Sequence, residues 1–450
     1  MMKSRFGKIL FFTFLLNLGL SLFLDLSYAL EVKRSVLDNG LVLLIVERHN
    51  LPVVKVSVGI DAGNLHEPED KAGLAGLVAS LLTEGTVRRT SRQISEEIEF
   101  VGGSVDTGGG KDFVTANLSV LKKDIDLGFD ILSDILLHPS FPEEEIGKKK
   151  DRIKGSLKAQ EDDPSFVASK NFIHEVFGSQ PYGRLVSGTP ETLDSITRDD
   201  LVQFHSAYYL PNNAVMAVVG DITGEEVQNL LKKYFSDWHS GQGAVYSLPL
   251  PGRAKGRKTV LIDKDLTQAS IILGHRGVSR DDPDYYALSV MNYIFGGGGF
   301  SSRLMQNIRE EKGLVYDIRS YFDANKYGGL FEVALQTKNG SANTAIEEVL
   351  REMNLIRTAP VSDQELSDAK SFLTGSFPMR IETSGRIAAF LVAVEYYGLG
   401  MDYIDRYPVY ITSITKEDIL RVAKKYLDPE HYVLVVVANQ EKAALRDEFR

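Results

Sequence analysis

Cysteine is absent from the 450 residues of this chain. Its absence excludes disulfide bonds, thiolate metal ligands, cysteine nucleophiles and a lipid anchor on cysteine. Positive charge is in deficit, because the chain has 51 Lys and Arg but 61 Asp and Glu, which gives a formal net charge of −10. This sign argues against nucleic acid or an anionic membrane as the main partner. The length exceeds what one hydrophobic core usually holds, about 250–300 residues, so at least two domains are expected.

Long apolar runs are confined to the first 29 residues. A basic start is followed by a mostly apolar stretch of 16 residues, from Ile9 to Leu24, which is short for a membrane span of about 20. Ser27 and Ala29 then offer small side chains at the two positions that a signal peptidase reads. Residues 1–29 are therefore predicted to be a signal peptide, cleaved to leave a periplasmic or extracellular chain without stable membrane insertion. An uncleaved anchor is the alternative.

The remainder of the sequence reads as a duplication. Residues 195–201 (SITRDDL) recur as residues 413–419 (SITKEDI), at an offset of 218. Each copy is followed by a helical pattern and then by an apolar strand. Gly155-Ser156-Leu157 recurs as Gly375-Ser376-Phe377, at an offset of 220. Matches in one order at nearly one offset indicate two homologous halves.

The halves are predicted at residues 30–240 and 258–450, joined by a linker at 241–257 that is rich in glycine and proline. Strands are expected at 41–47, 53–62, 259–262 and 269–274, and helices at 73–82, 143–160 and 285–294. Strands and helices mix without strict βαβ alternation. This favours an α+β fold in each half, with antiparallel sheets covered by helices on one face.

Several motifs resemble the pitrilysin/insulinase metallopeptidases, over nearly all of the chain after residue 29. They are residues 71–86 with the strand before them, Phe141-Pro142-Glu143-Glu144, Asp162-Asp163-Pro164, Pro181-Tyr182-Gly183, residues 209–213, Gly220-Asp221 and residues 296–316. The resemblance implies a duplicated peptidase-like α/β-roll fold.

The chemistry of that family rests on a helical H-x-x-E-H motif, which supplies two zinc ligands and a general base, and on a distant glutamate ligand. Aligned with this pattern, the chain has Gly76 and Ser80 at the histidines, Ala79 at the base and Ser156 at the distant ligand. Glycine and alanine carry no donor atom, and neutral hydroxyls are poor zinc ligands. No two of the eight histidines lie within five residues of each other. No metal or cofactor is therefore expected in this chain.

A second feature of the resemblance is retained. In active members an Arg and a Tyr of the carboxy-terminal half reach the substrate backbone across from the metal, and Arg309 and Tyr316 have the matching spacing. An arginine fork and a tyrosine hydroxyl both suit a carbonyl oxygen that becomes negative in the transition state. These residues are expected to act on a substrate bound to a partner's zinc.

A glycine run, Gly296 to Gly299, precedes them and is followed by Phe300. No P-loop Lys follows it, which argues against a phosphate site. It resembles the flexible glycine-rich loop that serves substrate capture in the non-catalytic subunit of the mitochondrial processing peptidase. A tight turn with close backbone packing is the other interpretation, and both stay open at this point.

The sequence thus predicts the zinc-less, substrate-binding subunit of an exported heterodimeric metallopeptidase, not catalytic alone. Its expected partners are a paralogous chain with H-x-x-E-H, which holds the zinc, and peptide substrates. One alternative is a non-enzymatic peptide-binding or structural protein that kept the peptidase fold. Another is an active peptidase with an unrecognised metal site, which the histidine spacing disfavours.

Overall fold

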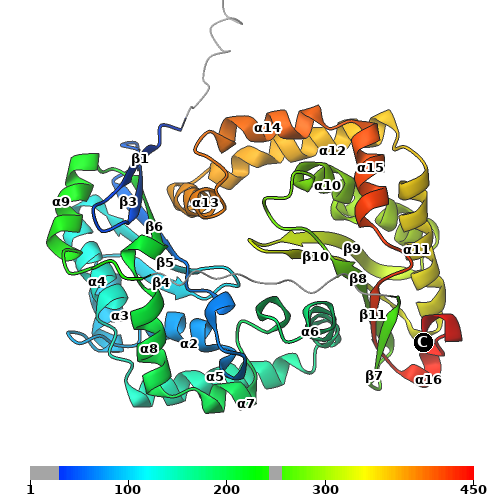
Figure 1. Cartoon of the computed structure of the whole chain (residues 1–450), viewed down its shortest axis with the longest axis horizontal. Coiled ribbons are helices and arrows are strands. Elements are labelled where there is room, and N and C mark those ends of the chain that lie inside the picture. The colour runs from blue at the N-terminus through cyan, green and yellow to red at the C-terminus, as the bar shows by residue number, and fades with distance from the viewer. Residues whose placement is uncertain (1–29, 243–255) are drawn as a thin grey trace, which may run out of the picture.

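The computed structural model describes residues 30–242 and 256–450. The predicted signal peptide and most of the predicted linker therefore lie outside the described residues. Figure 1 shows two halves side by side, each built on a β-sheet with helices packed against it.

The amino-terminal half contains a sheet of order β1-β2-β6-β3-β5-β4. Its strands are β1 Lys33–Val36, β2 Val42–Glu47, β3 Val53–Ile60, β4 Ser104–Gly108, β5 Val114–Leu121 and β6 Ala214–Gly220. Its helices are α2 Leu74–Leu81, α3 Ser91–Phe100, α4 Ile125–Leu137, α5 Glu143–Gln160, α6 Pro164–Phe177, α7 Pro190–Ser195, α8 Arg198–Tyr208 and α9 Gly224–Tyr234.

The carboxy-terminal half contains a sheet of order β7-β11-β8-β10-β9. Its strands are β7 Lys258–Asp263, β8 Gln268–Arg276, β9 Val315–Ala324, β10 Gly329–Lys338 and β11 Val433–Ala438. Its helices are α10 Tyr285–Asn292, α11 Ala342–Thr358, α12 Asp363–Ser376, α13 Ser384–Tyr396, α14 Tyr403–Ser413, α15 Lys416–Tyr426 and α16 Gln440–Ala443. Within residues 30–242 and 256–450, no helix combines the length and the apolar character needed to cross a membrane.

The sheets confirm the duplication. The order β2-β6-β3-β5-β4 of the first half corresponds to β7-β11-β8-β10-β9 of the second, and β1 is an additional edge strand. The sheets are not wholly antiparallel, because β2 pairs parallel with β6 and β7 pairs parallel with β11. In each pair one strand lies near the start of its half and the other near its end, so the intervening chain is long enough for the crossover that parallel pairing requires.

The repeated sequence motif is a helix N-terminus. Thr197 caps α8 by accepting a hydrogen bond from the Asp200 N–H, and the Asp200 carboxylate accepts from the Thr197 N–H. Thr415 and Asp418 form the same reciprocal cap on α15. The motif therefore recurs because each half must start an equivalent helix against its own sheet.

Helices cover both faces of each sheet, which differs from the predicted coverage of one face. The second face is covered by a helix from the opposite half: α13 lies on the amino-terminal sheet and α6 on the carboxy-terminal sheet (Figure 1). Leu391 and Val392 of α13 pack on β2 and β6, and Phe172 of α6 packs on β8 and β11. We call α6 and α13 the exchanged helices.

Candidate functional site

Three of the positions aligned with the zinc motif, Gly76, Ala79 and Ser80, lie on α2, and backbone lies close to the first of them. A Cβ on Gly76 would lie 2.7 Å from the carbonyl oxygen of Val186, and a Cβ on Gly109 would lie 2.7 Å from the Cα of Gly76. The helix N-terminus before it is capped by the buried carboxylate of Glu67, which accepts hydrogen bonds from the N–H groups of Gly73 and Ala75. A side chain at position 76 would therefore force the Val186 carbonyl group to move.

The other three positions make local contacts. Ala79 is fully buried, and its carbonyl oxygen accepts a hydrogen bond of 2.7 Å from the Thr107 hydroxyl. The Ser80 hydroxyl donates to the carbonyl oxygen of Leu77 at 3.0 Å. Ser156 is exposed on α5 and accepts from the Gln160 side chain at 3.0 Å. These residues do not fit a zinc ion, and the described part of the chain has no group of three His, Cys, Asp or Glu that could hold a metal.

Restoring the motif with Gly76→His, Ala79→Glu and Ser80→His is expected to destabilise the fold by about 2–3 kcal/mol, through overpacking at 76 and a buried charge at 79. It is not expected to create zinc binding. Thermal unfolding and calorimetric zinc titration measure the two effects, and Ser156→Glu at an exposed position is the control. Stoichiometric zinc uptake by the triple variant would show that the packing does not close the site.

The first three glycines of the run lie close to neighbouring atoms, whereas the substrate-capture interpretation expects a flexible loop. A Cβ at Gly296 would lie 2.5 Å from the Ser320 hydroxyl, at Gly297 2.6 Å from the Asn292 amide nitrogen and at Gly298 2.6 Å from the Tyr293 carbonyl oxygen. Gly299 has a φ of +58°, which suits glycine. Packing and backbone conformation therefore account for all four glycines.

Phe300, next to the glycine run, stacks on Arg309. The ring is 66% exposed, and its centroid lies 5.0 Å from the Arg309 guanidinium carbon, a cation–π arrangement. Arg309 lies on a π-helical segment, Met305–Glu311, and its ion pair with Glu310 is long, at 3.6 Å. The structure therefore brings together two predicted site residues and leaves donor capacity on the guanidinium.

Tyr316 lies at an irregularity of β9. The register between β9 and β10 shifts at Gln336 and Thr337, and the core residues Val315 and Ile318 are three positions apart instead of two. The bulge leaves Tyr316 outside the core with 73% of its surface exposed. Strand β9 packs against the segment that carries Arg309, so both residues are on neighbouring elements. Sequence spacing gave no sign of this bulge.

The end of the glycine-rich segment is tied to α12 by a charge pair. Arg303 donates two hydrogen bonds to Glu365, at 2.6 and 3.0 Å. Glu365 also accepts from the Ser362 N–H at the start of α12. Burial alone would raise the pKa of Glu365, but the hydrogen bonds from Arg303 and Ser362 outweigh it and lower the pKa to about 2.

This shift predicts acid sensitivity. Because the folded pKa of Glu365 lies below the unfolded value, its stabilisation is present above about pH 5 and is lost as the pH falls toward 2. The Glu365→Gln variant is expected to lose about 1–2 kcal/mol at pH 7 and to show a flatter loss of stability in acid. Chemical denaturation from pH 3 to 7 tests this. Glu96→Gln, at an exposed ion pair with Arg92, should keep the wild-type slope.

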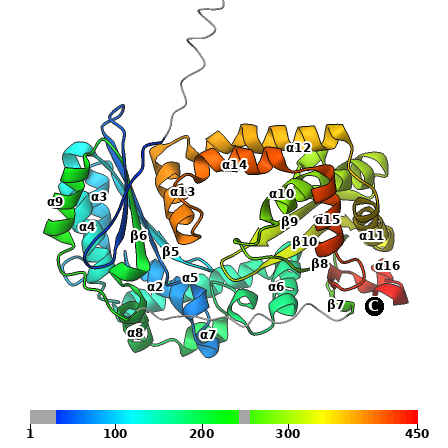
Figure 2. The ribbon, with the colours of Figure 1, turned by 45° about the horizontal axis from the view of Figure 1, so that its top comes forward.

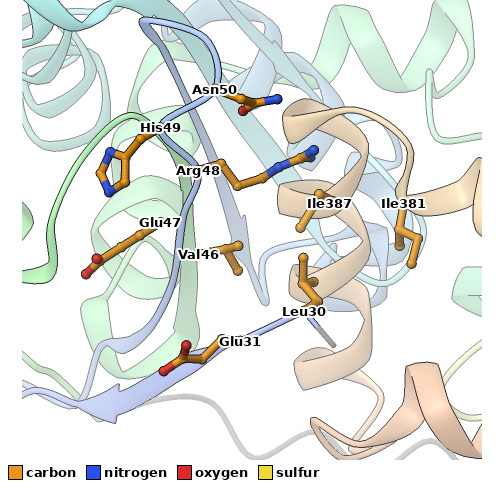
Figure 3. A pocket seen from close by; sticks show the side chains of 9 residues that line it. All are labelled: Leu30, Glu31, Val46, Glu47, Arg48, His49, Asn50, Ile381 and Ile387. Atoms are coloured by element: carbon orange, nitrogen blue, oxygen red, sulfur yellow. The ribbon is translucent and has the colours of Figure 1, made fainter. Parts of the chain in front are cut away.

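A cavity of about 500 Å³ lies elsewhere, between β2 and the start of α13 (Figure 3). Two of its polar groups are paired: Glu47 accepts from Lys33 at 2.7 Å, and His49 pairs with Asp221 at 2.6 Å. None of the predicted site residues lines it. The lining residues are Leu30, Glu31, Val46, Glu47, Arg48, His49, Asn50, Ile381 and Ile387.

Two family profiles match the chain in succession. Residues 42–190 match the family described as Insulinase (Peptidase family M16), and residues 195–373 match the Peptidase M16 inactive domain. A crystal structure of a peptidase M16 inactive domain from Pseudomonas fluorescens is similar to this chain with a TM-score of 0.85 and 26% identity, covering 91% of this chain and 98% of that one.

Curated relatives are similar over most of the chain. An uncharacterized zinc protease of Streptomyces coelicolor is 28% identical over 425 residues, which is 92% of this chain and 91% of the relative. A probable mitochondrial-processing peptidase subunit beta of Arabidopsis thaliana is 27% identical over 408 residues, which is 88% of this chain and 76% of the relative.

Proposed function

The chain belongs to the insulinase family of M16 peptidases, and we propose that it acts as the substrate-binding, non-catalytic subunit of an exported heterodimeric metallopeptidase. Its partner would be a paralogous chain that carries H-x-x-E-H and binds the zinc. Its substrates would be peptides, held between the two chains in the periplasm or outside the cell after removal of residues 1–29.

The observation that carries the proposal is a contrast between the halves. In the amino-terminal half, Gly76 is packed against backbone and Ala79 is buried without a donor side chain. In the carboxy-terminal half, Arg309 and Tyr316 remain accessible on neighbouring elements. A chain with Gly, Ala and Ser at the aligned zinc positions and with accessible donors at Arg309 and Tyr316 suits a role opposite another chain's metal. The Arabidopsis relative is named as a subunit of a peptidase, which agrees with an assembly of more than one chain.

In this role the partner's zinc would supply an activated water. Arg309 would donate hydrogen bonds to the peptide carbonyl oxygen, where negative charge develops as the water attacks, and its fixed charge would stabilise that oxygen. The Tyr316 hydroxyl would donate a further hydrogen bond and orient the peptide. Phe300 would hold the guanidinium in place through its ring.

The first test is a pull-down of the tagged chain from its native envelope fraction, with identification of the proteins that co-elute. Recovery of an equimolar companion bearing H-x-x-E-H, with chelator-sensitive peptide cleavage by the pair, is the expected result. Recovery of the chain with copies of itself alone would contradict the heterodimer and favour a non-enzymatic binding or structural role.

A further inference from the structure

The tips of two equivalent hairpins meet between the halves. The β4–β5 hairpin of the amino-terminal half and the β9–β10 hairpin of the carboxy-terminal half point toward each other in Figures 1 and 2. The Lys326 N–H donates a 2.9 Å hydrogen bond to the carboxylate of Asp112, and Lys111 forms a 3.1 Å ion pair with Asp323. Backbone and side-chain contacts therefore join the two tips.

Asp112 is the centre of this contact. It is 4% exposed, and its carboxylate accepts hydrogen bonds from Tyr182 at 2.5 Å and from Tyr397 at 2.8 Å, in addition to Lys326. Its backbone carbonyl accepts from the Tyr396 hydroxyl at 3.0 Å. One buried residue thus receives donors from both halves. Burial and the nearby Asp112 raise the pKa of Tyr182 and Tyr397 far above the ordinary value, so both hydroxyls remain donors.

A second carboxylate supports the same contact. Asp61 accepts a 3.1 Å hydrogen bond from Tyr396, pairs with His66 at 2.9 Å and lies 3.7 Å from the ammonium group of Lys326. The same ammonium lies 4.0 Å from the centroid of the Tyr396 ring. We call Asp61, Asp112, Tyr182, Lys326, Tyr396 and Tyr397 the inter-half junction.

The inter-half junction is continuous with the candidate site on both sides. On the amino-terminal side, the loop that carries Asp112 contains Gly109, which packs against Gly76 of α2. On the carboxy-terminal side, the turn that carries Lys326 follows β9, which carries Tyr316. A change in the junction would therefore move these elements relative to each other.

We propose that Asp112 is a positioning residue that locks the angle between the two halves. The exchanged helices hold each sheet near the opposite half, and Asp112 fixes the remaining freedom at the hairpin tips. Asp112 would affect peptide cleavage by setting the positions of Arg309 and Tyr316, and this effect rests on the proposed function. Its effect on the geometry of the chain does not.

The absence of cysteine permits a direct test. Cysteines introduced at the exposed positions Phe100 and Val409, one in each half, accept spin labels, and pulsed electron resonance then measures the distance between them. The wild-type chain is expected to give one narrow distance distribution. Asp112→Ala is expected to broaden it about twofold or more, because the hairpin tips lose their shared acceptor. An unchanged distribution would overturn the proposal.

A milder variant provides a test that does not depend on whether Asp112→Ala folds. Tyr397→Phe removes one of the donors to Asp112 and should also broaden the distribution, whereas Tyr234→Phe removes a tyrosine–aspartate hydrogen bond within one half and should not. Equal broadening by both would overturn the proposal. The distance is measured on this chain alone. Failure to find a zinc-bearing partner would therefore contradict the proposed function without affecting the proposal for Asp112.

Discussion

In a complex with the proposed zinc-bearing partner, the Arg309→Ala variant is expected to cleave peptides about 10²-fold more slowly than the wild-type chain. The physical reason is the loss of charged donors at the oxygen that becomes negative in the transition state. Within its own chain, Arg309 has a long ion pair with Glu310 at 3.6 Å and a stacking contact with Phe300. Its removal should therefore lower the rate without disrupting the fold. The measurement is kcat/KM on a quenched fluorescent peptide at saturating partner.

The controls separate charge from geometry. Arg309→Lys keeps the charge without the planar fork and should recover part of the rate. Arg92→Ala removes an exposed arginine on α3 and should cleave like the wild type. Tyr316→Phe, which removes one exposed hydroxyl, is expected to lower the rate about tenfold. If Arg309→Ala and Tyr316→Phe both cleave at the wild-type rate in an intact complex, the shared site is wrong.

Phe172→Ala is expected to destabilise the chain by about 3–5 kcal/mol, the cost of removing a large buried aromatic side chain. Phe172 belongs to exchanged helix α6 and is fully buried against the sheet of the opposite half. A Cβ on Gly274 of β8 would lie 2.9 Å from the tip of this ring, so the strand and the ring fit each other closely. The cavity left by alanine would lie between the halves. Urea denaturation measures the loss.

Phe100→Ala is the matched control, because it makes the same chemical change at a side chain that is 91% exposed. Its stability should stay within about 0.5 kcal/mol of the wild type. A loss for Phe172→Ala as small as that of the control would show that α6 does not hold the carboxy-terminal sheet in solution.

Much of the fold follows from patterns of the sequence. The offset of 218 between residues 195–201 and 413–419 predicts the duplication. Helices α8 and α15 confirm it, because both begin with a Thr–Asp capping box. The predicted helix at 143–160 coincides with α5, and the strand predicted at 53–62 contains β3. Caps, periodicity and apolar runs depend on near neighbours in the sequence, so they can be recognised without the fold.

The candidate site was predicted in part. The positions of Arg309 and Tyr316 came from the resemblance, but their surroundings did not. The bulge that exposes Tyr316 depends on the pairing of β9 with β10, and the contact of Arg309 with Phe300 depends on a π-helical segment. Glycines 296–299 have the composition of a flexible loop, yet the three of them that pack closely lie against Asn292, Tyr293 and Ser320.

The sequence by itself determined the family, the two halves and the absence of thiol chemistry, because each depends on residue identity and spacing. It also places no histidine or carboxylate at positions 76, 79, 80 and 156. Only the tertiary structure decided that α6 and α13 cross to the opposite sheet and that Asp112 gathers donors from both halves. The hydrogen bonds of Asp112 to Lys326 and Tyr397 join residues 214 and 285 positions apart in the sequence. Gly59 and Gly274 illustrate the difference. In the sequence each lowers the strand propensity of its segment, whereas in the fold each lies against a side chain of an exchanged helix that a Cβ would crowd.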